Sequence, residues 1–121
     1  MLTEPDQHPI DVRFTPEFKR NVRALAKRYR NIRSDIEPVI AQLRNGDFVG
    51  DQIPRLGYTL YKARIGNTDS RRGKSDGYRM IYYLRTSQNI VLITLYSKSD
   101  QSDVSANDIR RIIREFEETT L

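Results

Sequence analysis

The chain contains no cysteine and only one histidine among its 121 residues. Without cysteine it can form neither disulfide bonds nor thiolate metal sites, and nothing points to a secreted scaffold. The single histidine, His8, excludes a multi-histidine metal centre and a histidine-based catalytic triad. We therefore expect a protein that works without a metal or a cofactor.

Long apolar segments are also missing. No run approaches the ~20 residues of a membrane-spanning helix, and the N-terminus has no signal-peptide hydrophobic region. Residues 1–9 are polar and carry two prolines, so we expect a flexible N-terminal segment there and a single domain over residues 10–121. These absences predict a cytoplasmic protein with no membrane contact.

Positive charge dominates the chain and is unevenly distributed. The net charge is +5 and the isoelectric point is near 9.7. Positions 13–33 hold eight lysines and arginines against one acidic residue, and positions 55–85 hold eight against two. From position 100 onward, six acidic residues face three arginines. Such polarisation favours a polyanionic partner such as RNA, or an acidic protein.

The N-terminal part predicts a strand followed by a helix. Residues 10–14 alternate apolar and polar side chains, which is the period of a half-buried strand. Thr15 and Pro16 then predict a helix start, as an N-cap and a first-turn proline. Apolar residues at spacings of three and four continue this helix: Phe18, Val22, Leu25, Tyr29 and Ile32.

A second helix is predicted directly after the first. Ser34 and Glu37 match a capping box at its start, and Asn45-Gly46 matches a helix end. Pro38 lies early in this helix, so we expect it to delay the start by a residue or two.

Strand patterns dominate the second half. Residues 58–65, 78–84 and 90–96 are rich in strand-forming side chains. The nearly continuous apolar run over residues 90–95 predicts a central strand that is covered on both faces. Ser105 predicts the N-cap of a last helix. The order β-α-α-β-β-β-α indicates an α+β fold, with helices packed on a curved, antiparallel-rich sheet.

Four cations in the second half are candidates for chemistry. Lys62 and Arg64 are two residues apart on one predicted strand and therefore share a face of the sheet. Arg79 lies on the next strand, and Lys98 follows the last one. Cations in a concave site can hold a scissile phosphate, which permits metal-free RNA cleavage by the ribose 2′-hydroxyl. From the spacing alone, solvated strand residues are an equally good interpretation.

Three segments resemble the RelE/ParE toxin superfamily. They are LYKARI at residues 60–65, GKSDGYRMIYY at residues 73–83 and LYSK at residues 95–98. The second segment is the most specific, and the sequence is most similar to the HigB-like RelE branch. The similarity in element order covers about residues 10–118 and implies a RelE-like fold.

The resemblance implies the toxin of a type II toxin–antitoxin system, acting as a ribosome-dependent mRNA endonuclease. The implied partners are mRNA, the ribosome and a cognate DNA-binding antitoxin, with a monomeric free toxin and a hetero-oligomeric complex. By matching position, Lys62 and Arg64 would contact the substrate and assist proton transfer. Arg79 would clamp the transition-state phosphate, and Lys98 would be the basic residue after the last strand.

The chain departs from the family pattern at two positions. Ser99 stands where members often carry an arginine, and Ser105 where they often carry an aromatic base. The general base is therefore open, with Tyr82, Tyr83 and Tyr96 as candidates. Two alternatives to the endonuclease remain: a ParE-like inhibitor of DNA gyrase, and an inactive family member that serves as a binding module. ParE-type proteins generally lack the set of sheet-face cations.

Further residues are predicted to contact RNA. Arg71, Arg72 and Lys74 lie in a basic connection, where each phosphate contact would add salt-sensitive affinity. Tyr82 is a fourth candidate. The basic face of the first helix is either another RNA contact or a docking surface for an acidic antitoxin segment.

Overall fold

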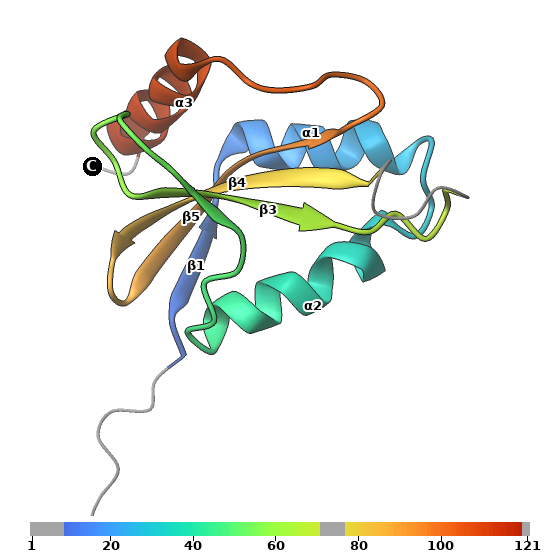
Figure 1. Cartoon of the computed structure of the whole chain (residues 1–121), viewed down its shortest axis with the longest axis horizontal. Coiled ribbons are helices and arrows are strands. Elements are labelled where there is room, and N and C mark those ends of the chain that lie inside the picture. Colours follow the sequence, from blue (N-terminus) through green and yellow to red (C-terminus); the bar gives the residue numbers. More distant parts are fainter. Residues whose placement is uncertain (1–8, 71–76, 120–121) are drawn as a thin grey trace, which may run out of the picture.

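The computed structural model describes residues 9–70 and 77–119, in which three helices and five strands follow one another (Figure 1). They are β1 (Asp11–Phe14), α1 (Pro16–Ala26), α2 (Ile32–Arg44), β2 (Asp51–Ile53), β3 (Leu60–Ile65), β4 (Tyr78–Thr86), β5 (Asn89–Ser97) and α3 (Ala106–Thr119). Residues 1–8 and the predicted RNA-contacting residues Arg71, Arg72 and Lys74 lie outside the described residues.

The five strands form one open, mixed sheet in the order β1-β5-β4-β3-β2. β1 runs parallel to β5, and the other neighbouring strands are antiparallel. α1 and α2 cover one face, where Phe18 and Ile36 are buried, and α3 covers the other, where Ile112 and Phe116 are buried. The predicted α+β, RelE-like arrangement is confirmed. β5 is covered on both faces as predicted, although β4 holds the middle of the sheet.

The start of α1 matches the prediction, but its end does not. Thr15 caps the helix, and its hydroxyl oxygen accepts a hydrogen bond from the N–H of Phe18 at 2.9 Å. α1 ends before Tyr29, whose ring packs edge-on against Tyr78, and Ile32 begins the next helix. The apolar stripe therefore reflects two helices buried on the same face rather than one continuous helix.

α2 begins earlier than the capping box predicts. Its first residue is Ile32, so Ser34 lies inside the helix and donates its hydroxyl to the backbone oxygen of Asn31. Asp69, from the connection after β3, accepts hydrogen bonds from the backbone and side-chain N–H groups of Asn31 at 2.9 Å. Pro38 is exposed inside the helix and does not delay its start. Asp69 thus supports the start of α2 from 38 residues away in sequence, so no local sequence pattern can predict this contact.

The structure adds a strand, β2, that the sequence pattern does not predict. β2 has three residues, too few to show an alternation, and pairs with β3 so that Asp51 lies opposite Lys62. Gly50 precedes it at φ +101°, and a Cβ there would collide with the carbonyl oxygen of Lys62. The order is therefore β-α-α-β-β-β-β-α, with β2 at the sheet edge beside the candidate cations.

β5 contains a bulge that changes which side chains face α3. The pairing register with β4 passes over Ile93, which is an extra residue in β5. Without the bulge, alternation would place Tyr96 on the face of Leu92, which α1 and α2 cover. With it, Tyr96 lies on the face of Ile93 and α3.

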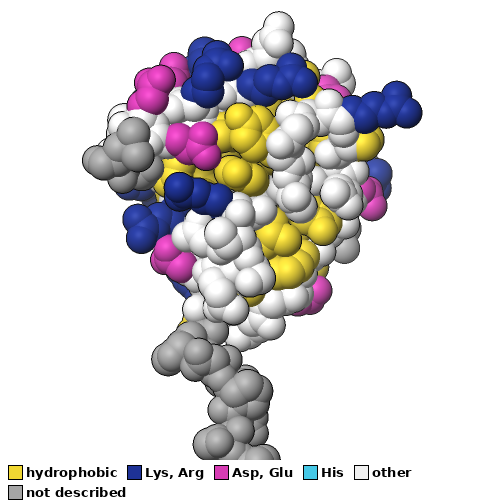
Figure 2. Space-filling model, turned by 90° about the vertical axis from the view of Figure 1, so that its left-hand side faces the viewer, with side chains coloured by type: hydrophobic (Ala, Val, Ile, Leu, Met, Phe, Trp, Pro, Cys, Tyr) yellow, Lys and Arg dark blue, Asp and Glu magenta, His cyan; other side chains and the backbone are white. Residues whose placement is uncertain are grey.

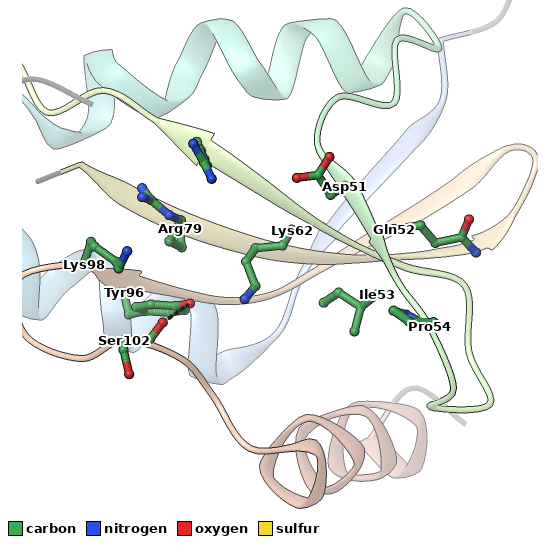
Figure 3. Close-up of a pocket in the computed structure, with 10 residues that line it drawn as sticks. Asp51, Gln52, Ile53, Pro54, Lys62, Arg79, Tyr96, Lys98 and Ser102 are labelled. Atoms are coloured by element: carbon green, nitrogen blue, oxygen red, sulfur yellow. Dashed lines mark hydrogen bonds between the residues drawn. The ribbon is translucent and has the colours of Figure 1, made fainter. Parts of the chain in front are cut away.

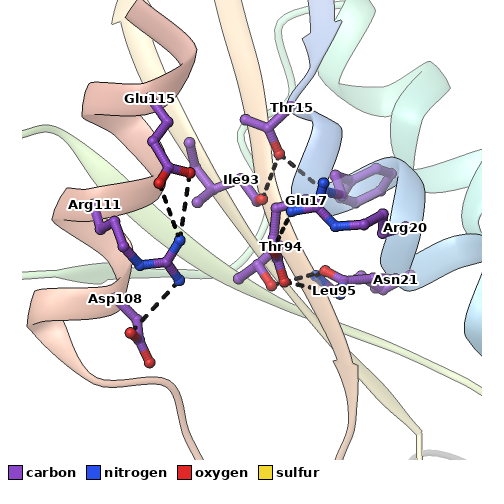
Figure 4. Close-up of polar contacts among 11 residues, drawn as sticks. Thr15, Glu17, Arg20, Asn21, Ile93, Thr94, Leu95, Asp108, Arg111 and Glu115 are labelled. Atoms are coloured by element: carbon purple, nitrogen blue, oxygen red, sulfur yellow. Dashed lines mark hydrogen bonds and ion pairs between the residues drawn. The ribbon is translucent and has the colours of Figure 1, made fainter.

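Two side chains of the N-terminal part hold this bulge (Figure 4). Oδ1 of Asn21 accepts hydrogen bonds from the N–H of Leu95 and the hydroxyl of Thr94, each at 2.9 Å. The hydroxyl of Thr15 donates to the carbonyl oxygen of Ile93 at 2.7 Å. Because β1 ends beside the bulge, these contacts stand in for a neighbouring strand along the edge of β5.

The surface at the β4–β5 hairpin end of the sheet carries mixed charge. Figure 2 faces this end and shows Lys and Arg side chains interspersed with Asp and Glu, with hydrophobic side chains in two patches. None of the helices within residues 9–70 and 77–119 is both long and apolar enough to cross a lipid bilayer.

Candidate functional site

A pocket of about 370 Å³ lies at the end of the sheet away from the β4–β5 hairpin, on the face that carries α3 (Figure 3). Tyr96 and Ser102 form one wall, and residues 51–54 form the opposite wall. All four predicted catalytic cations line the space between them: Lys62, Arg64, Arg79 and Lys98. The structure thus brings together residues from four strands and from the segment that follows β5.

Strand register explains why the cations converge. Lys62 and Arg64 share a face of β3, as the two-residue spacing predicts. Arg64 lies directly opposite Arg79, and Arg79 lies directly opposite Tyr96, so one row of side chains crosses three strands. Like charges directly opposite each other on neighbouring strands repel. An anion bound between the two guanidinium groups would relieve that repulsion.

Arg79 is buried in the protein yet lines the pocket. Its side chain has 7% exposure, and Nη1 donates to the backbone oxygen of Tyr78 at 3.2 Å. Within residues 9–70 and 77–119, Arg64, Arg79 and Lys98 form no ion pair. A guanidinium carries five N–H donors, so Arg79 keeps donors for an anion in the pocket.

Lys62 differs from the other three cations because it has an acidic partner. Its Nζ lies 2.9 Å from Oδ1 of Asp103, in the segment between β5 and α3. The hydrogen bond from Lys62, assisted by the N–H of Val104, lowers the pKa of Asp103 against the opposing effect of burial. In this pair Lys62 acts as a positive charge and a hydrogen-bond donor.

Two contacts fix the rest of this segment against the body of the protein. Asp100 forms an ion pair with Arg28, beyond the end of α1, at 2.7 Å. The N–H of Lys98 donates to the carbonyl oxygen of Gly77 at 2.9 Å. Asp100 therefore ties the acidic part of the chain to the basic N-terminal block, and the bond to Gly77 holds Lys98 beside the pocket.

Tyr96 is the candidate tyrosine that the structure places in the pocket. It has 5% exposure, and its hydroxyl donates to the carbonyl oxygen of Ser102 at 3.4 Å. Burial raises the pKa of Tyr96, and Asp103 adds to this effect, while the charges of Lys62 and Arg79 oppose it. A phenol with a raised pKa keeps its proton at neutral pH, so Tyr96 suits the role of proton donor better than that of base.

Tyr82 and Tyr83 do not line the pocket. Tyr82 is fully buried on the face covered by α1 and α2, where its hydroxyl donates to the carbonyl oxygen of Val49. Tyr83 packs edge-on against Tyr58 on the face that carries α3. Because Tyr82 lies on the opposite face of the sheet from the cations, its placement does not support contact with RNA.

The two serines at positions of departure from the family pattern make structural contacts. The hydroxyl oxygen of Ser105 accepts from the N–H of Asp108 at 3.1 Å and caps α3, as predicted. The hydroxyl of Ser99 lies 2.9 Å from that of Ser97. Neither Ser99 nor Ser105 lines the pocket, so neither side chain is placed to accept a proton there.

Asp51, Ser102 and Asp103 lie at the site but are not predicted by the sequence analysis. Asp51 belongs to a strand too short to recognise from alternation, and the two others lie in an irregular segment. In the sequence, only the acidic character of the chain after position 100 indicates that carboxylates there could pair with the basic segments. Among the described residues, no three His, Asp or Glu side chains gather as they do around a metal ion.

Comparison with known proteins identifies the family. The model of a family described as the RelE toxin of the RelE/RelB toxin–antitoxin system matches residues 17–120. The chain belongs to the RelE toxin family. It is therefore a toxin of a toxin–antitoxin system, with a RelB-type antitoxin as the partner that the family implies. A search of curated proteins finds no match. RelE-family toxins are generally ribonucleases, which directs attention to what the pocket can do with RNA.

Proposed function

We propose that this RelE-family toxin is an mRNA endonuclease that cuts mRNA on the ribosome through attack by the ribose 2′-hydroxyl. The proposal rests on one observation: four cations surround a single pocket, and three of them have no acidic partner among the described residues. A phosphodiester is the anionic group that every mRNA presents. Cations fixed in advance around a phosphate stabilise the charge that develops as the phosphate is attacked.

Each lining residue has a role that follows from its place. Arg79 is the phosphate clamp, because it is buried, fixed by packing and equipped with free donors. Arg64 binds the same phosphate from the adjacent strand, and Lys98 binds the backbone at the rim. Lys62 contributes positive charge, while Tyr96 donates a proton to the 5′-oxygen that leaves.

Inducing the toxin in cells is expected to stop translation and to leave mRNAs cut within codons, as mapped by primer extension. Attack by the 2′-hydroxyl leaves a 2′,3′-cyclic phosphate and a 5′-hydroxyl, so the new 5′ ends should accept label from polynucleotide kinase without prior dephosphorylation. A 2′-deoxy nucleotide at the scissile position should block the cut. New 5′-phosphate ends would contradict the mechanism, and loss of DNA supercoiling with intact mRNA would favour gyrase as the target.

A second surface suits the antitoxin. A groove of about 370 Å³ between α1 and α2 has an apolar floor that includes Phe18 and Ile36. Lys19, Arg23 and Arg33 stand at this groove against a single carboxylate, Glu37. A positive rim around an apolar floor complements an acidic amphipathic segment. We therefore assign this part of the basic helix face to antitoxin docking rather than to RNA.

Reversing two rim charges, in the variant Arg23→Glu with Arg33→Glu, is expected to slow antitoxin association about tenfold or more at low salt. RNA cleavage by the free toxin should be unchanged, because the groove lies on the opposite face from the cation pocket. The double variant Arg110→Glu with Arg114→Glu on α3 is the matched control, with the same charge change outside the groove. Biolayer interferometry measures the rate of association with the antitoxin. Equal rates for wild type, the groove variant and the control would reject the groove as the docking site.

A further inference from the structure

Asp51 places a carboxylate in the cation pocket. It lies on β2 directly opposite Lys62, and its side chain lines the pocket. Lys62 binds Asp103 instead, and the carboxylate of Asp51 forms no ion pair and accepts no hydrogen bond within residues 9–70 and 77–119. A carboxylate that lines the same pocket as four cations, yet forms an ion pair with none of them, is free to act on an anion that those cations hold.

The chemistry of the lining residues singles out Asp51. Ammonium and guanidinium groups only donate hydrogen bonds, and the phenol of Tyr96 keeps its proton at neutral pH, as phenols ordinarily do. Asp51 is the carboxylate among the lining residues, and a carboxylate accepts protons. The cations account for phosphate binding and leave the removal of a proton from the nucleophile without an agent. Asp51 can accept this proton, whereas the four cations and Tyr96 cannot.

We propose that Asp51 is the general base that takes the proton from the ribose 2′-hydroxyl. As this proton passes to Asp51, the 2′-oxygen forms a bond to phosphorus, and the bond between phosphorus and the 5′-oxygen breaks. The 5′-oxygen leaves with the electron pair and takes the proton of Tyr96. The products are a 2′,3′-cyclic phosphate and a 5′-hydroxyl. Asp51 then releases its proton to water, and Tyr96 takes up a proton from water, which restores the starting state. This inference rests on the proposed endonuclease function.

The position of Asp51 in the sheet fits an in-line displacement. The attacking and leaving oxygens of a phosphoryl transfer lie on opposite sides of phosphorus. Asp51 stands on β2 and Tyr96 on β5, with the cation-bearing strands β3 and β4 between them. In Figure 3, Asp51 and Tyr96 lie on opposite sides of Lys62. A phosphate held by the central cations therefore has a proton acceptor on one side and a proton donor on the other.

The test measures single-turnover cleavage of mRNA on programmed ribosomes by wild-type toxin, Asp51→Asn and Asp51→Ala. Both variants are expected to cut about 10²–10⁴-fold more slowly, the usual contribution of a general base. Both should still bind ribosomes that carry a 2′-deoxy scissile nucleotide with wild-type affinity. Added formate should restore cleavage to Asp51→Ala, because a free carboxylate can take the vacated place. Asp47→Asn is the matched control, since Asp47 is an exposed carboxylate outside the pocket.

Three outcomes separate this inference from the function on which it rests. Near-wild-type cleavage by Asp51→Asn, while Arg79→Met is inactive, overturns the role of Asp51 and leaves the endonuclease proposal standing. Slow cleavage by Asp51→Ala that formate does not restore also overturns it, because the carboxylate would then serve structure or binding. If wild-type toxin fails to cut the all-ribose mRNA, the endonuclease proposal itself fails.

Discussion

Arg79→Met is expected to abolish RNA cleavage and, in the same protein, to raise the free energy of unfolding. Loss of one fixed donor at a developing negative charge typically slows a reaction about 10²–10³-fold, and loss of the charged clamp should cost at least that much. Arg79 lies directly opposite Arg64, and it has no acidic partner within the described residues. Its removal therefore takes away the phosphate contact and a repulsive pair of charges together.

The gain in stability has two sources. Arg79 is a buried cation, and methionine fills most of its volume without charge or unsatisfied donors. Cross-strand repulsion with Arg64 also disappears. Because the guanidinium reaches the pocket and is partly solvated there, we expect a gain of only about 1 kcal/mol. Urea unfolding monitored by circular dichroism measures it.

Two control variants show whether the loss of cleavage and the gain in stability both arise from Arg79. Arg85→Met makes the same change on β4, at an exposed position outside the pocket, and should leave cleavage and stability nearly unchanged. Arg79→Lys keeps the charge but loses the planar fork of donors, so its activity should fall between those of wild type and Arg79→Met. A folded Arg79→Met toxin with wild-type cleavage would show that Arg79 does not clamp the phosphate. A destabilised variant would show that Arg79 supports the fold instead.

Some features of the site follow from local sequence patterns, whereas others depend on how the strands pair. Lys62 and Arg64 share a face because side chains alternate along a strand, and this local rule is legible in the sequence. That Arg79 meets Arg64 depends on the register between two strands, which the long connection between them does not specify. The resemblance to the RelE family supplied Arg79, whereas its direct pairing with Arg64 needed the structure.

Local sequence patterns do not predict that Tyr96 and Asp51 reach the pocket, for different reasons. Simple alternation along β5 assigns Tyr96 to the wrong face, because the extra residue Ile93 reverses the parity after it. The contacts that hold this bulge come from Asn21, more than 70 residues away in sequence. Asp51 reaches the pocket because three residues pair with β3, and a three-residue strand has no recognisable period. The shared face of Lys62 and Arg64 is thus encoded locally, while the positions of Tyr96 and Asp51 depend on tertiary contacts.

Gly50→Ala is expected to lower the free energy of unfolding by about 2–4 kcal/mol, since two penalties add. Gly50 has φ +101°, a conformation that L-residues with a Cβ adopt at a cost of about 1–2 kcal/mol. A Cβ at this position would also lie against the carbonyl group of Lys62 and the Cα of Ala63, both backbone atoms that cannot rotate away. β2 must therefore move away from β3 to admit even one methyl group.

Gly57→Ala separates the two penalties, because Gly57 also has a positive φ, +83°, but its Cβ would meet nothing within 4 Å. It should lose only about 1–2 kcal/mol and keep full cleavage activity. In Gly50→Ala the shift of β2 also carries Asp51 away from the phosphate, and a displacement of about 1 Å can slow catalysis 10²-fold. Thermal unfolding and single-turnover cleavage, measured on both variants, compare the effects. Equal losses of stability would mean that strain alone acts at Gly50. Full cleavage by a destabilised Gly50→Ala toxin would mean that the position of β2 does not matter to the reaction.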